Sequence, residues 1–175
     1  ARVEEPGQLA PPPNPCLRFA GLRTNPGRIL MQVSSAMARG KTLAALNALC
    51  HAVHSLLRYQ PGATGIYTTA EEAIAGGRGV CQDYAHVFIA LARLAGWHAR
   101  YCMGLTVGEG ATHAWAEIYY EGAWHGFDPT RDCRTDASYL RFATGRDAAD
   151  CPVEQGTFYG LADQTQTVFM RVKEI

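Results

Sequence analysis

The segment that decides the fold occupies residues 76–96 and reads GGRGVCQDYAHVFIALARLAG. After its glycine-rich turn, apolar residues recur at three- and four-residue spacing, which predicts an amphipathic helix that begins at Cys81 and ends at Gly96. The apolar residues of its one face are Tyr84, Ala85, Phe88, Leu91, Ala92 and Ala95. A cysteine therefore stands in the first turn of this predicted helix, directly after the turn at 76–79.

Three further helices are expected upstream. Asn25-Pro26 sets up the start of the first, and apolar residues at helical spacing predict a second over 43–57. A short third helix is expected over 70–75. It is opened by two overlapping capping-box patterns, Thr68 with Glu71 and Thr69 with Glu72.

Beyond Gly96 the period of the apolar residues changes to two, as expected for β-strands. Strands are expected over 98–105, 113–120 and 124–127, with a turn at Glu121-Gly122, and two strand-like runs follow at 157–160 and 165–173. Helices that precede strands, without βαβ alternation, predict an α+β fold. In this fold the N-terminal helices and the Cys81 helix pack on an antiparallel sheet.

Length and composition favour a single folded domain. The chain has 175 residues, of which 47% are hydrophobic and 18% charged, enough apolar material to bury a full core. Five of the nine prolines lie in residues 1–15, which indicates a tail or linker. The folded domain is therefore expected to span 16–175.

Charge and cysteine usage exclude several classes of protein. Sixteen basic residues balance sixteen acidic ones, and the apolar stretches are shorter than the ~20 residues of a membrane span, so neither nucleic acid nor a membrane is an expected partner. The six cysteines are irregularly spaced and form no CxxC pair, which favours reduced thiols over a disulfide scaffold or a zinc site. No signal-peptide pattern is visible, and a cytoplasmic location is expected.

The placement of Cys81 is typical of a nucleophile. Free backbone N–H groups and the positive end of the helix dipole favour a thiolate there. By itself this position is not decisive, because most lone cysteines are small buried hydrophobic residues.

A predicted hairpin supplies the partners of such a nucleophile. His113 begins one strand and Asp128 ends the next. With a two-residue turn at Glu121-Gly122, Asp128 faces Trp115, and His113 lies two positions further along on the same face. A carboxylate and an imidazole are then within reach of each other. A helix-start cysteine with a His–Asp pair is the arrangement that nucleophilic thiol catalysis requires.

Several motifs in this order resemble bacterial transglutaminase-like proteins, which are often described as cysteine proteases. The motifs are GVCQDYAH at 79–86, Ala99-Arg100-Tyr101, HAWAE at 113–117 and GFDPT at 126–130, with YQPGAT at 59–64 and Gly145-Arg146-Asp147 further out. The resemblance covers about 40–175. It implies a papain-like, transglutaminase-like core with a catalytic triad of Cys81, His113 and Asp128. Members of the family usually carry an N-terminal β-sandwich region, which this sequence is expected to lack.

The implied reaction is acyl transfer on a peptide, isopeptide or glutamine-type amide bond of a peptide or protein substrate. The favoured interpretation is hydrolysis, in which the acyl group is released to water, as in a cysteine protease or amidase. The alternatives are transfer to a lysine amine, as in a transglutaminase, or a binding module that keeps the fold without catalysis. No cofactor and no metal is expected, and the oligomeric state is left open.

The roles of other polar residues are also predicted. One oxyanion donor is expected to be the backbone N–H of Cys81, and Tyr59, Tyr67 and Gln82 are candidates for the second. Structural roles are expected for His86, Asp83 and His125, because helix and strand geometry turns His86 and His125 away from the triad. Trp115 and Trp124 are expected to pack in the core or across strands, with a wall of the site as the alternative for Trp115. His51 and His54 have no evident partner.

Overall fold

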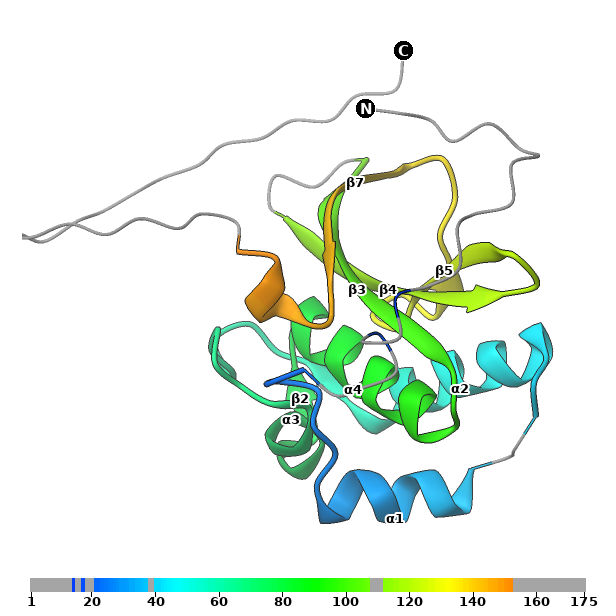
Figure 1. Ribbon diagram of the computed structural model, residues 1–175. Helices are drawn as coiled ribbons and strands as arrows, with labels where there is room; N and C mark the ends of the chain where they lie inside the picture. The colour runs from blue at the N-terminus through cyan, green and yellow to red at the C-terminus, as the bar shows by residue number, and fades with distance from the viewer. Residues whose placement is uncertain (1–13, 15–16, 18–20, 38–39, 108–111, 153–175) are drawn as a thin grey trace, which may run out of the picture.

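The computed structural model describes residues 14, 17, 21–37, 40–107 and 112–152, and places a layer of helices against one sheet (Figure 1). The helices are α1 (Arg28–Ala36), α2 (Leu43–Leu56), α3 (Ala70–Gly76) and α4 (Cys81–Leu94). The sheet contains β3 (His98–Thr106), β4 (His113–Tyr120), β5 (Ala123–Asp128), β6 (Cys133–Arg134) and β7 (Tyr139–Gly145). A short parallel pair, β1 (Arg58–Tyr59) and β2 (Arg78–Gly79), lies apart from it, and a 3-10 turn follows at Ala148–Asp150. The predicted α+β class is confirmed.

One of the two capping boxes predicted at the start of α3 is present in the structure. Thr69 and Glu72 form the predicted capping box of α3, with Thr69 Oγ1 accepting from Glu72 N and Glu72 Oε2 accepting from Thr69 N. The overlapping box of Thr68 with Glu71 was wrong. Glu71 instead accepts three backbone N–H bonds, from Gly27, Ile29 and Leu30, and so caps α1 from a neighbouring helix.

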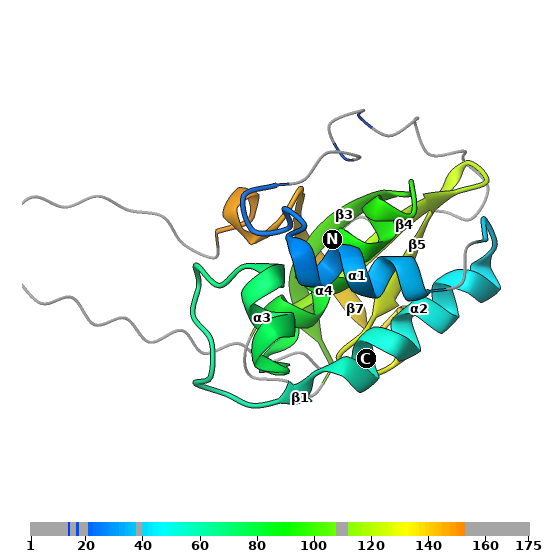
Figure 2. The same cartoon turned by 90° about the horizontal axis from the view of Figure 1, so that it is seen from below.

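Helix α4 is the centre of the molecule. It lies between the sheet on one side and α1, α2 and α3 on the other (Figures 1 and 2). From Asp83 to Arg93 every residue of α4 is buried, and Phe88 packs on Phe127 of β5 with ring centroids 5.5 Å apart. Burial on all faces is what a helix enclosed by two layers requires. The position of Cys81 is thereby fixed by the most deeply packed element of the fold.

The sheet is antiparallel in the order β6-β5-β4-β3-β7. Its first three strands in sequence agree with the predicted strands 98–105, 113–120 and 124–127. Strand β7 was not predicted, and it pairs with the far edge of β3. The strand-like runs predicted at 157–160 and 165–173 lie outside the described residues.

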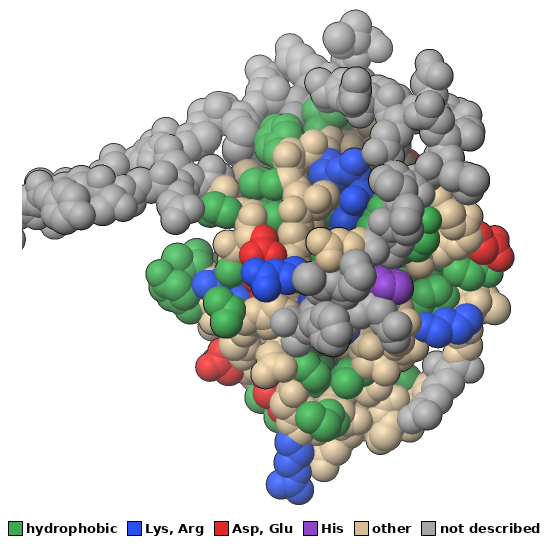
Figure 3. Space-filling view, viewed as in Figure 1, with side chains coloured by type: hydrophobic (Ala, Val, Ile, Leu, Met, Phe, Trp, Pro, Cys, Tyr) green, Lys and Arg blue, Asp and Glu red, His purple; other side chains and the backbone are tan. Residues whose placement is uncertain are grey.

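The surface agrees with the balanced charge of the sequence. On the face drawn in Figure 3, the described Lys and Arg side chains are interspersed with acidic and apolar ones. Among the described residues, no helix has the length and the apolar character that crossing a bilayer demands. The five cysteines in this part of the chain are all free thiols.

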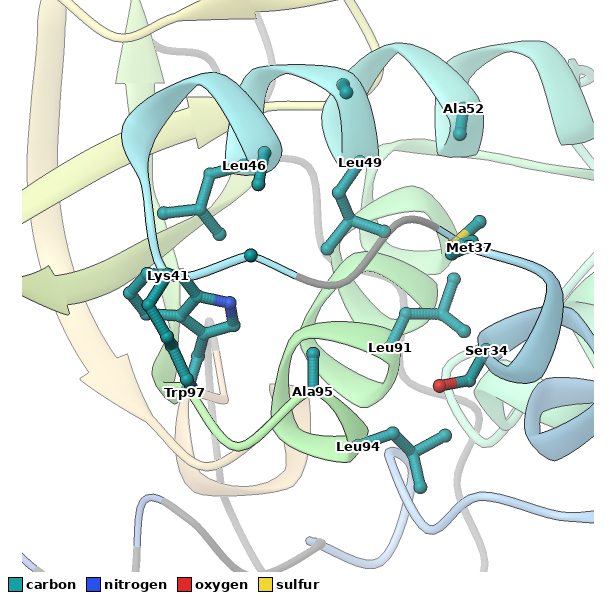
Figure 4. Close-up of a pocket in the computed structure, with 13 residues that line it drawn as sticks. Ser34, Met37, Lys41, Leu46, Leu49, Ala52, Leu91, Leu94, Ala95 and Trp97 are labelled. Carbon is teal, nitrogen blue, oxygen red and sulfur yellow. The ribbon is translucent and has the colours of Figure 1, made fainter.

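An apolar cavity of about 640 Å³ lies between α1, α2 and α4 (Figure 4). Its walls include Leu46, Leu49, Leu91 and Trp97, with Lys41 at one end. These residues surround the C-terminal half of α4, whereas Cys81 begins the helix. At 1.5 Å per residue the two places are about 15–20 Å apart along the axis. The cavity is therefore separate from the candidate active site.

Candidate active site

Cys81 is partly exposed at the start of α4, and hydrogen bonds to Asp83 hold the turn before it. The Asp83 carboxylate accepts hydrogen bonds from Val80 N at 2.8 Å and from Thr64 Oγ1 at 2.6 Å. Gly79 leaves the space for this carboxylate, since a Cβ there would lie 2.6 Å from the Asp83 side chain. Burial raises the pKa of Asp83, and these hydrogen bonds oppose it. The prediction that Asp83 serves the helix start is confirmed.

The hairpin of β4 and β5 brings His113 and Asp128 together. Tyr120 pairs with Ala123 across the two-residue turn Glu121-Gly122, where both residues have positive φ. This is the turn geometry that matches the twist of a hairpin, and it gives the predicted register. His113 Nε2 lies 2.7 Å from Asp128 Oδ2, and the two residues are 4% and 0% exposed. The predicted contact between the His113 imidazole and the Asp128 carboxylate is confirmed.

The third group, Cys81, interacts with His113. Burial by itself lowers the pKa of His113, but hydrogen bonds to Asp128 and to Cys81 outweigh it and raise the pKa to about 9. Because Nε2 bonds Asp128, Nδ1 is the ring nitrogen left for Cys81. Cys81 of α4, His113 of β4 and Asp128 of β5 thus form one continuous chain of hydrogen bonds.

Asp128 has donors on both carboxylate oxygens. Oδ2 accepts from His113 and from the Tyr139 hydroxyl at 2.8 Å, and Oδ1 accepts from the backbone of Thr130 at 2.9 Å and of Arg131 at 3.3 Å. Burial favours the neutral acid, but these interactions, led by the bond with His113, lower the pKa of Asp128. The carboxylate is therefore charged and fixed in orientation at neutral pH.

Tyr139 is the residue of this site that sequence reasoning missed. It begins β7, which was not predicted. A signal was present: the pattern Asp136-Ala137-Ser138 is typical of a turn, and Tyr139 follows it at the head of a run that includes Leu140 and Phe142.

Two histidines without a predicted partner contact the loop that follows Asp128. His54 Nδ1 lies 3.1 Å from the carbonyl oxygen of Pro129, and His51 Nδ1 lies 2.6 Å from Asp132 Oδ2. Both histidines belong to α2, so this helix contacts the loop that follows β5. Sequence separations of 75 and 81 residues explain why local patterns did not indicate these pairs.

The other predicted structural histidines do lie apart from the chain of hydrogen bonds. His86 is fully buried, and its Nε2 accepts from Ala148 N at 3.1 Å. His125 contacts the Tyr120 carbonyl and the Arg134 guanidinium. Packing and hydrogen bonding account for both residues, as predicted.

The three candidates for the second oxyanion donor lie near the start of α4 or on the surface. Gln82 Nε2 donates to the Gly65 carbonyl at 3.4 Å. Tyr67 is 76% exposed, with the Arg23 guanidinium 5.0 Å from its ring centroid. Tyr59 is 53% exposed on β1. Which group donates to an oxyanion stays a prediction.

A helix-start cysteine beside a histidine–carboxylate pair on an antiparallel sheet defines the papain-like, transglutaminase-like class of architecture. Residues 32–129, more than half of the chain, match the transglutaminase-like superfamily. The chain belongs to this superfamily.

Individual relatives agree with this assignment. An uncharacterized protein of Mycobacterium leprae is 35% identical over 116 residues, which cover 61% of this chain and 41% of the relative. Another, from Mycobacterium tuberculosis, is 34% identical over 130 residues, covering 65% and 41%. This chain thus spans less than half the length of these curated relatives.

Solved structures share the fold. A Cytophaga hutchinsonii structure titled "Putative Cysteine Protease" superposes with a TM-score of 0.69 at 29% identity, covering 78% of this chain and 48% of that one. Legionella pneumophila LapG superposes with a TM-score of 0.51 at 16% identity, covering 69% and 70%, and this likeness concerns the fold alone.

Proposed function

We propose that this protein is a thiol-dependent acyl-transfer enzyme that hydrolyses peptide, isopeptide or glutamine-type amide bonds. The observation that carries the proposal is the chain of hydrogen bonds from Cys81 through His113 to Asp128, with 2.7 Å between His113 Nε2 and Asp128 Oδ2. The partial exposure of Cys81 supports it further, since a nucleophile needs access to its substrate.

The first half of the reaction transfers the acyl group to sulfur. The Cys81 thiol gives its proton to His113, and the thiolate attacks the carbonyl carbon to form a tetrahedral oxyanion. Collapse of this intermediate breaks the C–N bond, and the His113 imidazolium gives its proton to the departing amine. The products are a Cys81 thioester and a free amine, or ammonia when the substrate is a glutamine side chain.

The second half releases the acyl group. Water gives a proton to His113 and attacks the thioester, and the returning proton regenerates the Cys81 thiol with a free carboxylic acid. Asp128 holds the imidazole ring so that one nitrogen faces the sulfur, and its charge stabilises the imidazolium in both halves. An amine in place of water would give the transglutaminase reaction.

The comparisons support the same class of chemistry. The solved relative from Cytophaga hutchinsonii is described as a "Putative Cysteine Protease". This chain covers 48% of that protein. The substrate and the activity of the present protein as a whole are therefore part of what we propose.

Alkylation of the purified chain with iodoacetamide at pH 7 tests the nucleophile. We expect Cys81 to be labelled at least tenfold faster than Cys133, which is the exposed cysteine of the described residues and the matched control. Cys81→Ala should abolish the fast phase and leave the slow labelling of Cys133. Equal labelling of both cysteines would contradict an activated nucleophile and favour a binding module.

A peptide-library screen then tests the acceptor. Cleaved or deamidated peptides that depend on Cys81 indicate hydrolysis. In the presence of an added primary amine, a product that carries this amine indicates transfer, which mass spectrometry distinguishes by mass.

A further inference from the structure

The Asp128 carboxylate is shared between two side chains. Its Oδ2 atom accepts one hydrogen bond from His113 Nε2 at 2.7 Å and another from Tyr139 Oη at 2.8 Å. We infer that Tyr139 is a positioning residue of this site, whose hydroxyl takes up part of the Asp128 charge that acts on His113. This inference rests on the proposed function for its catalytic meaning, although the contact with Asp128 stands independently.

The register of the sheet places Tyr139 on the correct face. Tyr139 pairs with Thr106, and Gly104, two residues earlier on the same strand, pairs with His113. Residues that pair across an antiparallel ladder share a face, as do residues two apart on one strand. Tyr139 therefore lies on the same face of the sheet as His113, although β7 and β4 are separated by β3.

Gly104 provides the room across this gap. A Cβ at this position would lie 1.9 Å from the Leu140 carbonyl oxygen and 2.8 Å from Cη2 of Trp115. The Trp115 ring thus covers the glycine, and the Tyr139 ring packs edge-on against it with centroids 5.3 Å apart. His113 lies 6.2 Å from Tyr139 and 6.3 Å from Trp115, also between ring centroids. Three aromatic rings thereby hold the hydroxyl where it meets Asp128.

The hydroxyl acts as a donor toward Asp128. Burial and the neighbouring groups, the Asp128 carboxylate among them, raise the pKa of Tyr139 far above its ordinary value, so the phenol keeps its proton. The thiol of Cys133 lies 3.6 Å from the same oxygen and can donate to it. Arg131 also faces this carboxylate, with its Nε 3.9 Å from Asp128 Oδ2. Its guanidinium donates to Thr106 Oγ1 and lies 5.8 Å from the Tyr139 ring centroid.

Two donors on one carboxylate oxygen weaken each other's hydrogen bond, because each withdraws negative charge from that atom. Removal of the Tyr139 hydroxyl should leave more charge on the bond to His113 and stabilise the imidazolium. An imidazolium that is too stable is a poorer acid toward the departing amine. Tyr139 would thus keep the pKa of His113 low enough for the imidazolium to give its proton to the departing amine.

Tyr139→Phe tests this role, since it removes the hydroxyl and keeps the ring. Two readouts are compared with wild type: the pKa of the His113 ring by NMR, and the pH dependence of Cys81 alkylation by iodoacetamide. We expect the His113 pKa and the alkaline limb of the alkylation profile to move up by roughly 0.5–1 unit. Tyr120→Phe, at the other end of β4, is the matched control and should change neither. A Tyr139→Phe variant that titrates as wild type does would overturn the inference.

A double-mutant cycle with Asp128→Ala shows whether Tyr139 acts through Asp128. In the Asp128→Ala background, Tyr139→Phe should leave the alkylation profile unchanged. An equal effect in both backgrounds would also overturn the inference, because a general packing defect behaves in this way. Failure of the proposed function is distinguishable: wild-type Cys81 would then label no faster than Cys133, while the NMR titration would still report on Tyr139.

Discussion

His113 Nε2 and Asp128 Oδ2 lie 2.7 Å apart on neighbouring strands, in surroundings where the two residues are 4% and 0% exposed. Each of them depends on the other for its ionised form. The pKa of His113 is raised and that of Asp128 is lowered, although burial acts in the opposite direction on both. Loss of either partner would remove the strongest interaction that offsets the burial of the other.

Asp128→Asn removes the charge and keeps the shape of the side chain. Burial then acts on His113 with the contact to Cys81 opposing it and no carboxylate, so the pKa of His113 should fall well below its value of about 9. Amide hydrolysis should decrease by about 10³–10⁴, as expected when the imidazole loses its orienting carboxylate. NMR titration of the His113 ring measures the first effect and steady-state kinetics on a peptide found by the library screen measures the second. An unchanged His113 pKa would contradict the assigned pairing.

Stability should decrease at alkaline pH because of the same pair. The pKa of His113 is raised on folding, so the stabilisation by its protonated form is complete below about 6.5 and is lost as pH rises through about 9. The free energy of unfolding should fall by a few kcal/mol over this range. Urea denaturation at pH 6 and pH 9.5 measures this change. In Asp128→Asn the difference in the free energy of unfolding between the two pH values should largely disappear. A wild-type protein equally stable at both values would contradict the raised pKa.

Stability should also decrease at acidic pH, because of His86. Its Nε2 accepts a hydrogen bond from Ala148 N, and burial lowers its pKa to about 4. Other charged groups act on its pKa as well, Asp147 raising it and Arg23 and Arg93 lowering it. A histidine that is neutral in the native state stabilises fully above about 6.5 and loses this contribution as pH falls toward 4. The loss should be roughly 3 kcal/mol.

His86→Gln tests this acid sensitivity. The Gln side chain offers a carbonyl acceptor for Ala148 N and does not titrate. The variant should be less stable than wild type at pH 7 and should lose less stability between pH 7 and 4.5 in urea denaturation. His51→Gln is the control, because His51 is exposed on α2. Equal acid dependence in wild type and His86→Gln would show that His86 is not responsible.

Local patterns predicted the parts of the fold that neighbours in sequence determine. The α4 helix follows from its apolar period and from the glycine-rich turn before Cys81. The contact of His113 with Asp128 follows from a two-residue turn at Glu121-Gly122, because a short turn fixes the register of both strands. The sequence therefore correctly predicted that two of the three candidate catalytic residues, His113 and Asp128, lie next to each other.

Contacts between segments far apart in sequence were not predicted. Strand β7 carries exposed Phe142 and the paired Arg141, so apolar and polar residues do not alternate clearly along it. The turn pattern at 136–138 precedes it, but its pairing with β3, which defines the strand, is not visible in a local pattern. Tyr139 was missed for this reason, and so was the cap that Glu71 provides for α1 across 42 residues. Tertiary partners, and not local propensity, determine these contacts.

Gly104→Ala tests whether the close approach over β3 is required. A Cβ would meet the Leu140 carbonyl oxygen at 1.9 Å and Trp115 at 2.8 Å, so β7 or the Trp115 ring must move. We expect a loss of about 1–3 kcal/mol in the free energy of unfolding, as for an overpacked core. Because Trp115 stacks with His113 and packs edge-on against Tyr139, Cys81 alkylation should also slow. Gly65→Ala is the matched control, since a Cβ there meets no atom within 4 Å. If Gly104→Ala matched Gly65→Ala in both stability and alkylation rate, the packing of Tyr139 and Trp115 over this glycine would have no part in holding the site.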